Sequence, residues 1–470
     1  MRILALALLL AASASSQSLP TGERFLTHLN TELLPFWMNP AAFGTPQGAF
    51  PTTRCDDGSA VDFARPCIEV GRNGWLTQQQ HFLVAQSRQT YAYGVAFHLT
   101  GERRYLDLMK SGVDFIRRNM IDRNAGGMFV TRSLPNGQWG PQVNFRNAQE
   151  LAYGVLGLGF YYYLTRDPEV LYDIMSIRDH ILGRYYNPET NALRWVLAQN
   201  GGDRPNDKRL VAQLDQMNAY LVLLTPTLPE PYQTESKQAL SVIAHLMIDQ
   251  FYSPQDNLFF LTANTPQEVA TATAGTDFGH TIKAMWMIRY TGLLTGETDL
   301  VEFSEINGPK VLARAYQATS GAWASGVKNA GQLDLDKSWW IYAELDQFAA
   351  TLAINNQDTA KYLPRTYDYW FTKFVDPKYG EVWTTVSGTT NLPVPGDLPK
   401  QWPWKNGYHS LEHALVGYIT SQQLNNEAVK LYYAFPPESS NTRPYYYEGR
   451  IENTEQTATR IWRADFREVH

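Results

Sequence analysis

The chain has 470 residues, a formal net charge of −6 and only 18% charged residues. A lightly charged, weakly acidic protein lacks the basic surface that attracts nucleic acids or anionic membranes, so we expect neither as a partner. Aromatic residues make up 13% of the chain. Aromatic faces stack on sugar rings but also fill large helical cores, so the composition is compatible with a carbohydrate ligand without requiring one.

The first segment predicts export. Residues 3–12 are almost wholly apolar and run into the small residues Ala12-Ser13-Ala14. This pattern is typical of a secretory signal peptide, so residues 1–17 are excluded from the fold. No later apolar run reaches the length of a membrane span. The sequence therefore predicts a secreted or periplasmic protein that has no membrane anchor after cleavage.

The two cysteines, Cys55 and Cys67, predict a disulfide in an exported chain. They fall in residues 18–75, where Pro46 and Pro51 interrupt any helix, so this segment is expected to be an irregular N-terminal arm stapled onto the main body. A metal site would need more ligands at closer spacing. We therefore expect no metal site at these cysteines.

Two strong helices follow the arm, from Gln78 to Leu99 and from Tyr105 to Met120. Beyond them, a turn followed by a short extended run recurs at regular spacing, and two helical segments fill each interval. The turns lie at residues 122–130, 187–195, 253–260, 318–323 and 376–383.

A repeated helix pair indicates a repeat architecture. Closed on itself, it gives an all-α (α/α)6 barrel over residues 76–435, with short β-hairpins at the rim. An open helical solenoid with polar capping repeats is the alternative. The polar, tyrosine-rich tail, residues 436–470, is expected to pack on the outside of the barrel.

Residues 400–420 combine tryptophans, a lysine and an imidazole in a loop that runs into a helix with an apolar face. Imidazole can move a proton near neutral pH, although a tryptophan-rich core edge with one satisfied histidine has the same pattern. Similar polar side chains lie near the starts of other predicted helices. Each of them could act in a functional site, or could instead be a helix cap or a member of a structural ion pair. The candidates are Arg88, Asn147, Glu150, Asp215, Asn218, His280, Lys283, Trp339, Trp340, Glu344, Trp404, Lys405, His409 and Glu412.

Four motifs occur in a fixed order along the chain: Arg88 in Gln-Ser-Arg-Gln, Gly279-His280 with Trp286, Trp339-Trp340 with Glu344, and Trp404-Lys405 with Tyr408-His409. In these motifs the chain resembles the N-acylglucosamine 2-epimerase superfamily, which includes cellobiose 2-epimerases and mannose isomerases, from about residue 76 to about residue 425. The resemblance implies an (α/α)6 barrel and no metal or nucleotide as a reactant, so we expect no cofactor.

The resemblance also implies a mechanism on an open-chain mono- or oligosaccharide. One histidine removes the proton at C2, a cis-enediol forms, and a second histidine returns the proton at C2 or C1. His280 and His409 match these two positions. Arg88 matches the group that steadies the developing oxyanion. The other candidates would bind the sugar, the tryptophans by stacking.

Three positions depart from the family pattern. Lys283 stands where the family has a glutamate after Gly-His, and Glu412 stands where it often has an arginine. Asp215 to Asn218 replaces a segment that carries a histidine in the family. We therefore expect His280 to lack the carboxylate that would orient it.

Two other classes of function stay open. An exported glycan-cleaving enzyme on the same barrel could be a hydrolase, with two carboxylates among Glu150, Asp215, Glu344 and Glu412. It could also be a uronate lyase that uses a histidine or tyrosine base with Arg88 or Lys283. A non-catalytic glycan-binding relative is the third hypothesis.

Overall fold

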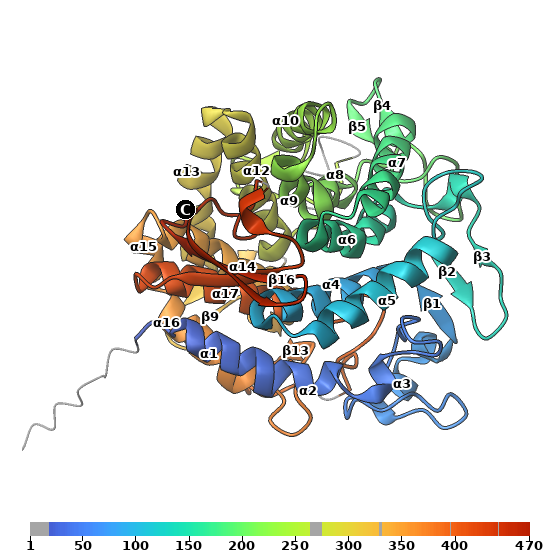
Figure 1. Ribbon diagram of the computed structural model, residues 1–470, viewed down its shortest axis with the longest axis horizontal. Helices are drawn as coiled ribbons and strands as arrows, with labels where there is room; N and C mark the ends of the chain where they lie inside the picture. The colour runs from blue at the N-terminus through green and yellow to red at the C-terminus, as the bar shows by residue number, and fades with distance from the viewer. Residues whose placement is uncertain (1–17, 264–274, 329–330, 395, 440) are drawn as a thin grey trace, which may run out of the picture.

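The computed structural model describes residues 18–263, 275–328, 331–394, 396–439 and 441–470; the predicted signal peptide lies outside them. Two layers of helices surround a common centre (Figure 1). The inner layer consists of α4 (Leu83–Thr100), α6 (Ala148–Thr165), α8 (Leu210–Gln216) continued by η5 (Met217–Leu221) and α9 (Val222–Leu224), α12 (Phe278–Thr295), α14 (Trp339–Ala353) and α17 (Tyr408–Leu424).

The inner helices are enclosed on all sides. In α4, every residue from Leu83 to Leu99 is buried, which requires neighbours around the whole helix. Each inner helix contacts the next one along the chain, and α17 contacts α4. The ring is therefore closed. The predicted (α/α)6 barrel is confirmed, and the open solenoid is wrong.

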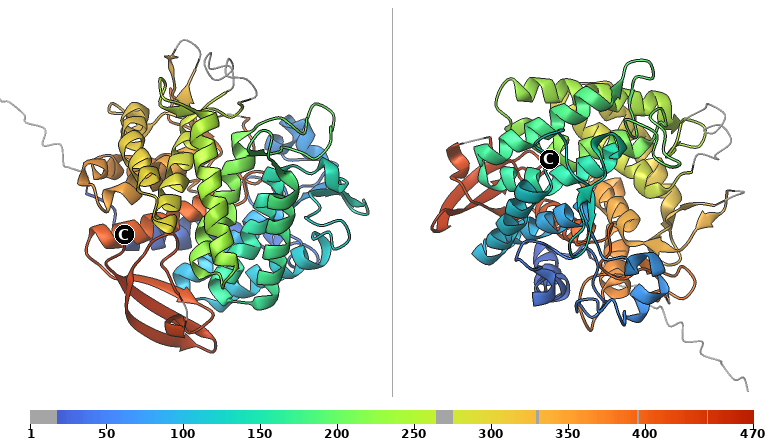
Figure 2. Two further views of the ribbon diagram at one scale, coloured as in Figure 1. Left: turned by 90° about the horizontal axis from the view of Figure 1, so that it is seen from above. Right: turned by 90° about the vertical axis from the view of Figure 1, so that its right-hand side faces the viewer.

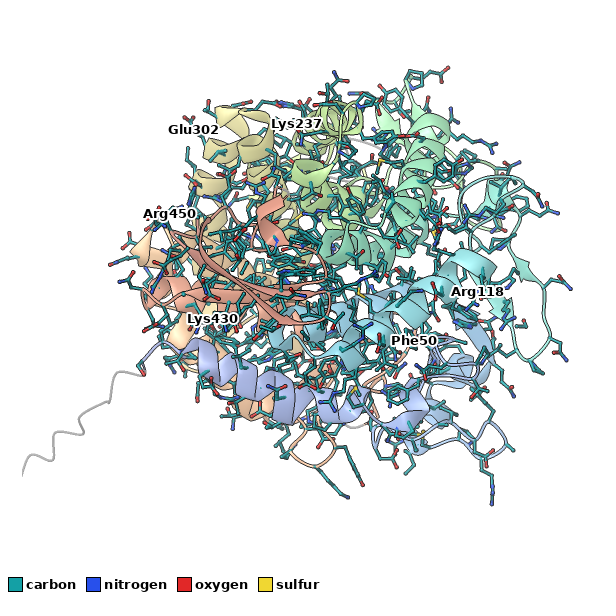
Figure 3. All side chains as sticks on the ribbon, in the orientation of Figure 1. Phe50, Arg118, Lys237, Glu302, Lys430 and Arg450 are labelled. Atoms are coloured by element: carbon teal, nitrogen blue, oxygen red, sulfur yellow. A yellow bond between two sulfur atoms is a disulfide. The ribbon has the colours of Figure 1, made fainter. Side chains whose placement is uncertain are left out.

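The outer helices are amphipathic. In α5, the buried positions include Tyr105, Met109 and Ile116, which lie on one side of the helix. Charged side chains such as Arg118, Lys237 and Glu302 lie at the outside (Figure 3). The outer layer consists of α5 (Arg103–Asn119), α7 (Pro168–Tyr185), α10 (Tyr232–Phe251), α13 (Thr298–Ala315), α15 (Gln357–Ala360) with α16 (Leu363–Tyr369) and η8 (Trp370–Phe374), and α1 (Gly22–Thr27) with η1 (His28–Leu33) and α2 (Leu34–Trp37).

The N-terminal arm differs from the expectation of an irregular segment. Residues 22–37 are helical, and α1 packs against α17. Phe25 is fully buried there, so close to Gly417 that a Cβ at Gly417 would lie 2.2 Å from the Phe25 ring. This segment is the outer partner of α17. The barrel therefore begins near residue 22, well before residue 76.

Short β-hairpins follow the outer helices at the predicted turns. The three strands β1 (Gln80–Phe82), β2 (Thr131–Ser133) and β3 (Trp139–Gly140) form one small antiparallel sheet. The remaining pairs at this end are β4 (Tyr186–Asn187) with β5 (Ala192–Leu193), β6 (Tyr252–Ser253) with β7 (Leu258–Phe259), β8 (Tyr316–Gln317) with β9 (Ala322–Trp323), β10 (Gly326–Val327) with β11 (Leu333–Asp334), and β12 (Lys337–Ser338) with β13 (Thr385–Val386).

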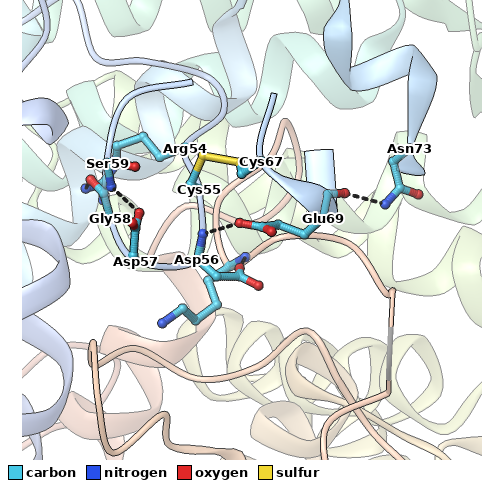
Figure 4. Close-up of a disulfide and its surroundings, with 10 residues drawn as sticks. Arg54, Cys55, Asp56, Asp57, Gly58, Ser59, Cys67, Glu69 and Asn73 are labelled. Atoms are coloured by element: carbon cyan, nitrogen blue, oxygen red, sulfur yellow. Dashed lines mark hydrogen bonds between the residues drawn. A yellow bond between two sulfur atoms is a disulfide. The ribbon is translucent and has the colours of Figure 1, made fainter. Parts of the chain in front are cut away.

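A disulfide joins Cys55 to Cys67, as predicted. Inside the loop that it closes, the Asp56 backbone N–H donates to Glu69 (Figure 4). The Asp56 carboxylate accepts a 2.7 Å hydrogen bond from the backbone N–H of Lys400. The stapled loop therefore holds the start of the 400–405 segment in place. The short helices α3 (Ile68–Arg72) and η3 (Gly74–Thr77) follow it.

The C-terminal segment forms a sheet and a buried insert. Strands β14 (Val429–Tyr433), β16 (Ile461–Arg467) and β15 (Arg450–Ala458) pair antiparallel in that spatial order. This sheet lies at the end of the molecule opposite the β10–β11 hairpin (Figure 2). Tyr445, Tyr446 and Tyr447 are 2%, 6% and 1% exposed, so the expected external position is wrong for these three residues. Among the described residues, no helix is long and apolar enough to cross a membrane.

Candidate active site

A cavity of about 420 Å³ opens where the inner helices begin. Each of α4, α6, α12, α14 and α17 contributes side chains from its first two turns. Helix N-termini carry partial positive charge and free N–H groups, so the cavity suits a ligand with developing negative charge. It is lined by Arg88, Gln149, Tyr153, His280, Lys283, Ser338, Trp339, Trp340, Thr384, Thr385, Asp397, Leu398, Trp402, Trp404 and His409.

The polar groups follow the repeat. The sixth residue of five inner helices carries a polar side chain near the cavity: Arg88, Tyr153, Asp215, Lys283 and Glu344. Arg88, Tyr153 and Lys283 line the cavity directly. Asp215 and Glu344 are buried against side chains that line the cavity. The same helix register thus brings side chains from distant parts of the chain to one place.

His280 is oriented by a carboxylate. Asp277 precedes α12, where its Oδ1 accepts the His280 backbone N–H at 2.7 Å and its Oδ2 lies 2.6 Å from His280 Nδ1. Nε2 is therefore the ring nitrogen left for the cavity. The expectation that His280 lacks an orienting carboxylate is wrong. Asp277, three positions before His280, takes the place of the glutamate that the family has three positions after the histidine.

Gly279 has a packing reason. A Cβ there would lie 2.6 Å from the ring of Trp340. The Trp340 ring in turn contacts His280 edge to face, at 4.6 Å between centroids. Glycine therefore allows Trp340 to reach the histidine.

His409 lies deeper than His280. Its side chain is 5% exposed, compared with 18% for His280. Nδ1 of His409 lies 3.4 Å from Oε1 of Glu344, which leaves Nε2 for the cavity. Burial, followed by the charges of Arg88 and Lys283, holds the pKa of His409 well below its usual value. His409 is therefore neutral at physiological pH, a form that can accept a proton.

Lys283 forms a buried ion pair. Its Nζ lies 2.7 Å from Asp215 Oδ1 and donates to the Tyr153 hydroxyl at 2.8 Å. Gln149 also donates to Asp215, at 2.8 Å. Burial alone would lower the pKa of Lys283, but the Asp215 carboxylate outweighs it and raises the pKa. Lys283 is therefore a fixed cation at the cavity floor.

Arg88 is held by aromatic faces. Its guanidinium lies 4.0 Å from the Tyr153 ring centroid, 5.1 Å from Tyr408 and 5.2 Å from Trp404. Nη1 donates to the Trp404 carbonyl, and the buried Nε has no hydrogen-bond partner in the described part of the chain. Arginine stacked in this way keeps its charge and has a donor to spare for a ligand.

Two glutamates lie beneath His409. Glu344 and Glu412 are both fully buried, and burial raises the pKa of each, to about 7 for Glu412. Tyr445, from the C-terminal insert, donates to Glu412 Oε1 at 2.6 Å. Both oxygens of Glu344 and Oε2 of Glu412 have no hydrogen-bond partner among the residues that the structure describes.

The other predicted residues lie in three kinds of place. Trp339, Trp340 and Trp404 line the cavity. Asn218 lies below it, where its amide donates to the Tyr408 hydroxyl at 2.8 Å. Asn147 and Lys405 are absent from the lining: Asn147 caps α6 by accepting the Glu150 N–H, and Lys405 forms a buried 2.9 Å ion pair with Glu381.

Sequence reasoning missed several residues of the site. Tyr153 and Gln149 could have been found from the repeat, because Tyr153 holds the register of Arg88, Asp215 and Lys283. The wall formed by Thr384, Thr385, Asp397 and Leu398 comes from a long connection with no regular pattern. Tyr445 lies 33 residues beyond Glu412, and nothing in the local sequence indicates that it turns inward.

Carboxylate and imidazole atoms of Glu344, His409 and Glu412 all lie within 4.8 Å of one another. These are atom types that bind metal ions, and they form the group nearest the cavity that could hold one. The predicted absence of a cofactor stays a prediction.

Comparison with known proteins identifies the family. The sequence profile of N-acylglucosamine 2-epimerase (GlcNAc 2-epimerase) matches residues 68–412. Cellobiose 2-epimerase of Ruminococcus albus is 25% identical over 349 residues, which are 70% of this chain and 85% of that one.

Solved structures share the fold. The structure of cellobiose 2-epimerase from Spirochaeta thermophila superposes with a TM-score of 0.69 at 18% identity, covering 86% of this chain and 97% of that one. A D-mannose isomerase structure superposes with a TM-score of 0.68 at 14% identity, covering 85% and 98%. The chain therefore belongs to the N-acylglucosamine 2-epimerase family, and it is a carbohydrate epimerase or isomerase.

Proposed function

We propose that the protein moves a proton at C2 of an open-chain reducing sugar, with His280 and His409 as the two proton-transferring groups. The observation that carries this proposal is that two imidazoles from distant helices line one cavity, each with Nδ1 facing a carboxylate. An imidazole whose Nδ1–H is held by a carboxylate presents Nε2 as a base.

The two histidines flank one aromatic ring. Trp340 lies 4.6 Å from the His280 ring and 6.0 Å from the His409 ring, between centroids. A sugar stacked over the tryptophans would carry C2 within reach of both walls. One histidine removes the proton at C2, and the other returns it from the opposite face or at C1. Return at C2 gives the epimer and return at C1 gives the ketose.

Arg88 and Lys283 would stabilise the intermediate. Removing the C2 proton moves negative charge onto the carbonyl oxygen at C1. Both cations line the cavity, and both are fixed before the reaction, Arg88 by aromatic rings and Lys283 by Asp215. Pre-positioned charge of this kind contributes on the order of 3–4 kcal/mol to transition-state stabilisation.

The carboxylates favour this reaction over cleavage. A glycoside hydrolase needs two carboxyl groups on opposite sides of the scissile bond. Asp215 is neutralised by Lys283, and Glu344 and Glu412 lie together behind His409. Glu150 is held by Asn147 and is absent from the cavity lining. No pair of the four candidates therefore spans the cavity.

The test is proton exchange. The mature protein would be incubated in heavy water with cellobiose and with D-mannose, and the products followed by NMR. Deuterium at C2 of an epimer, or at C1 of a ketose, with the glycosidic bond intact is the expected result. New reducing ends or unsaturated products without exchange would assign the cavity to cleavage instead.

We also propose that the protein is exported. The disulfide between Cys55 and Cys67 supports this, because such bonds persist in oxidising compartments. Fractionation of the native source, with thiol labelling before and after reduction, tests it. Detection in the periplasm or medium with no free thiol is expected; a reduced protein in the cytoplasm would contradict the proposal.

A further inference from the structure

The buried cluster behind His409 has more hydrogen-bonding capacity than the protein satisfies. Glu344 and Glu412 are 0% exposed, and His409 is 4% exposed. Among the described residues, both oxygens of Glu344, Oε2 of Glu412 and Nδ1 of His409 have no hydrogen-bond partner, although Nδ1 of His409 lies 3.4 Å from Oε1 of Glu344. The Gln347 amide also acts on Glu412, and its own polar atoms have no partner there. Buried polar atoms without partners cost about 1–3 kcal/mol each, so one further hydrogen atom held between the carboxyl groups would stabilise the cluster.

Charge balance identifies that atom. Lys283 and Asp215 neutralise each other at 2.7 Å. Arg88 donates to a backbone carbonyl, so its positive charge is left to balance one buried glutamate. A second ionised glutamate would have no counter-charge, and an uncompensated buried charge is strongly unfavourable. One proton on the pair restores neutrality.

We propose that Glu344 and Glu412 share one proton beneath His409 and deliver it to Nδ1 of that histidine during turnover. The shared proton itself stands on geometry and charge; only its delivery rests on the proposed function. Glu412 is one of the positions at which this chain departs from the family pattern, so the family pattern alone does not predict the pair. Burial raises the pKa of both carboxyl groups, which agrees with a retained proton.

Groups from every neighbouring element act on the pair. Arg88 and Lys283 favour its ionised form, and Asp215 opposes ionisation of Glu344. Tyr445 donates to Glu412 at 2.6 Å and fixes the orientation of that carboxyl group. The remaining titratable groups around the cluster are Tyr91 from α4, Tyr153 from α6, His280 from α12, Tyr408 from α17 and Tyr446 from the tail.

The proton's position sets the role of His409. When Glu344 is ionised, it accepts Nδ1–H and leaves Nε2 as a base. When Glu344 carries the proton, it donates to Nδ1 and leaves Nε2–H as an acid. A histidine with a depressed pKa does not hold a second proton readily, so a neighbouring acid is what allows His409 to donate.

The step balances. The Nε2–H bond breaks as its proton joins the electron pair of the enediolate at C2, while the carboxyl O–H bond breaks and Nδ1–H forms. His409 stays neutral, and the negative charge that the enediolate loses appears on the carboxyl pair, with Arg88 and the protonated His280 as counter-charges. His280 then releases to the solvent the proton that it took from C2, the solvent returns one proton to Nε2 of His409, and Nδ1 returns its proton to the pair.

Infrared difference spectroscopy of the ligand-free protein tests the shared proton without using activity. In wild type at neutral pH, a protonated carboxyl C=O band that shifts in heavy water is expected. Glu412→Gln and Glu344→Gln should each abolish this band, and the double variant should lose no more than either single one. Glu150→Gln is the control: Glu150 is a separate, half-buried acid whose pKa is raised to about 7, so this variant should lose only the band of Glu150 and keep the band of the pair.

Three results would overturn the inference: no band lost in Glu412→Gln, two additive losses in the double variant, or a stoichiometric divalent metal by elemental analysis. Proton delivery is tested separately, with isosteric Glu412→Gln. The ratio of C2 deuterium uptake in unreacted sugar to product formation should rise at least about tenfold, and an unchanged ratio contradicts delivery. If the protein exchanges no C2 proton at all, the proposed function fails while the infrared result stands.

Discussion

The two walls that carry His280 and His409 use the same side chain in different surroundings. His280 begins α12 beside Asp277, a single carboxylate from its own helix cap, and its side chain is 18% exposed. His409 begins α17 at 5% exposure, and the carboxylate behind it belongs to a fully buried pair that Tyr445 braces from the C-terminal segment. In the proposed mechanism, His280 would therefore exchange protons directly with the solvent, whereas His409 would depend on the buried carboxyl pair.

The largest expected effect is the loss of either histidine. His280→Gln and His409→Gln should each lower kcat by about 10²–10⁴-fold, the usual contribution of general acid–base catalysis. Added imidazole should restore part of the activity of His280→Gln and little of His409→Gln, because only the first site is open. Steady-state kinetics with and without imidazole checks this.

His245→Gln provides the matched control for both histidines. His245 pairs with Glu297 between outer elements, far from the cavity lining, so activity should be unchanged. If imidazole restored the activity of His280→Gln and His409→Gln equally, the two histidines would not differ in their access to solvent.

Loss of Lys283, which lies in the cavity between the two histidines, should have a large effect on the free energy of unfolding. Lys283→Met leaves Asp215 buried and uncompensated, which costs about 3–5 kcal/mol in the free energy of unfolding. Adding Asp215→Asn should recover part of the loss. Denaturant unfolding of the two variants checks this, with Lys110→Met as control, since the exposed Lys110–Asp114 pair contributes less than about 1 kcal/mol. A cost as small as that of the control would contradict a fixed cation.

Asp277→Asn tests only the side of the cavity that carries His280. Losing a charge-assisted hydrogen bond of about 1.5–3 kcal/mol should lower kcat roughly 10- to 100-fold and leave KM nearly unchanged. Glu297→Gln, beside His245, is the control. A wild-type rate in Asp277→Asn would mean that Asp277 acts only as a helix cap.

The smallest effect concerns stability and pH at the enclosed wall. The pKa of Glu412 is raised from 4.5 to about 7, so the folded state binds this proton more tightly than the unfolded state does. Its contribution to stability is full below pH 4.5 and is lost as pH rises toward 7. Wild type should therefore lose about 2 kcal/mol more than Glu412→Gln between pH 5 and pH 8. Parallel slopes for the two proteins would contradict the raised pKa of Glu412.

The features of the fold and the site that repeat along the chain could be predicted from the sequence. Regular turns and helix pairs predicted the barrel, and motifs at helix starts predicted His280, His409 and Arg88 as neighbours. The contacts that individual side chains make with distant parts of the chain could not be predicted. Lys405 follows Trp404 in a promising motif, yet it turns away to Glu381. Tyr445 lies in a polar tail, yet it is buried, because burying a tyrosine that finds a hydrogen-bond partner outweighs the polarity of its neighbours.

The first helical segment, residues 22–37, packs against α17 near the end of the barrel. The ring therefore cannot close until almost the whole polypeptide has left the ribosome. Such high contact order delays folding, because the loop entropy is lost before the last contacts form. A ring that closes only when residues 22–37 meet α17 closes late, and late closure suits the export proposed above, because a translocation channel for unfolded polypeptides accepts a chain whose fold is incomplete.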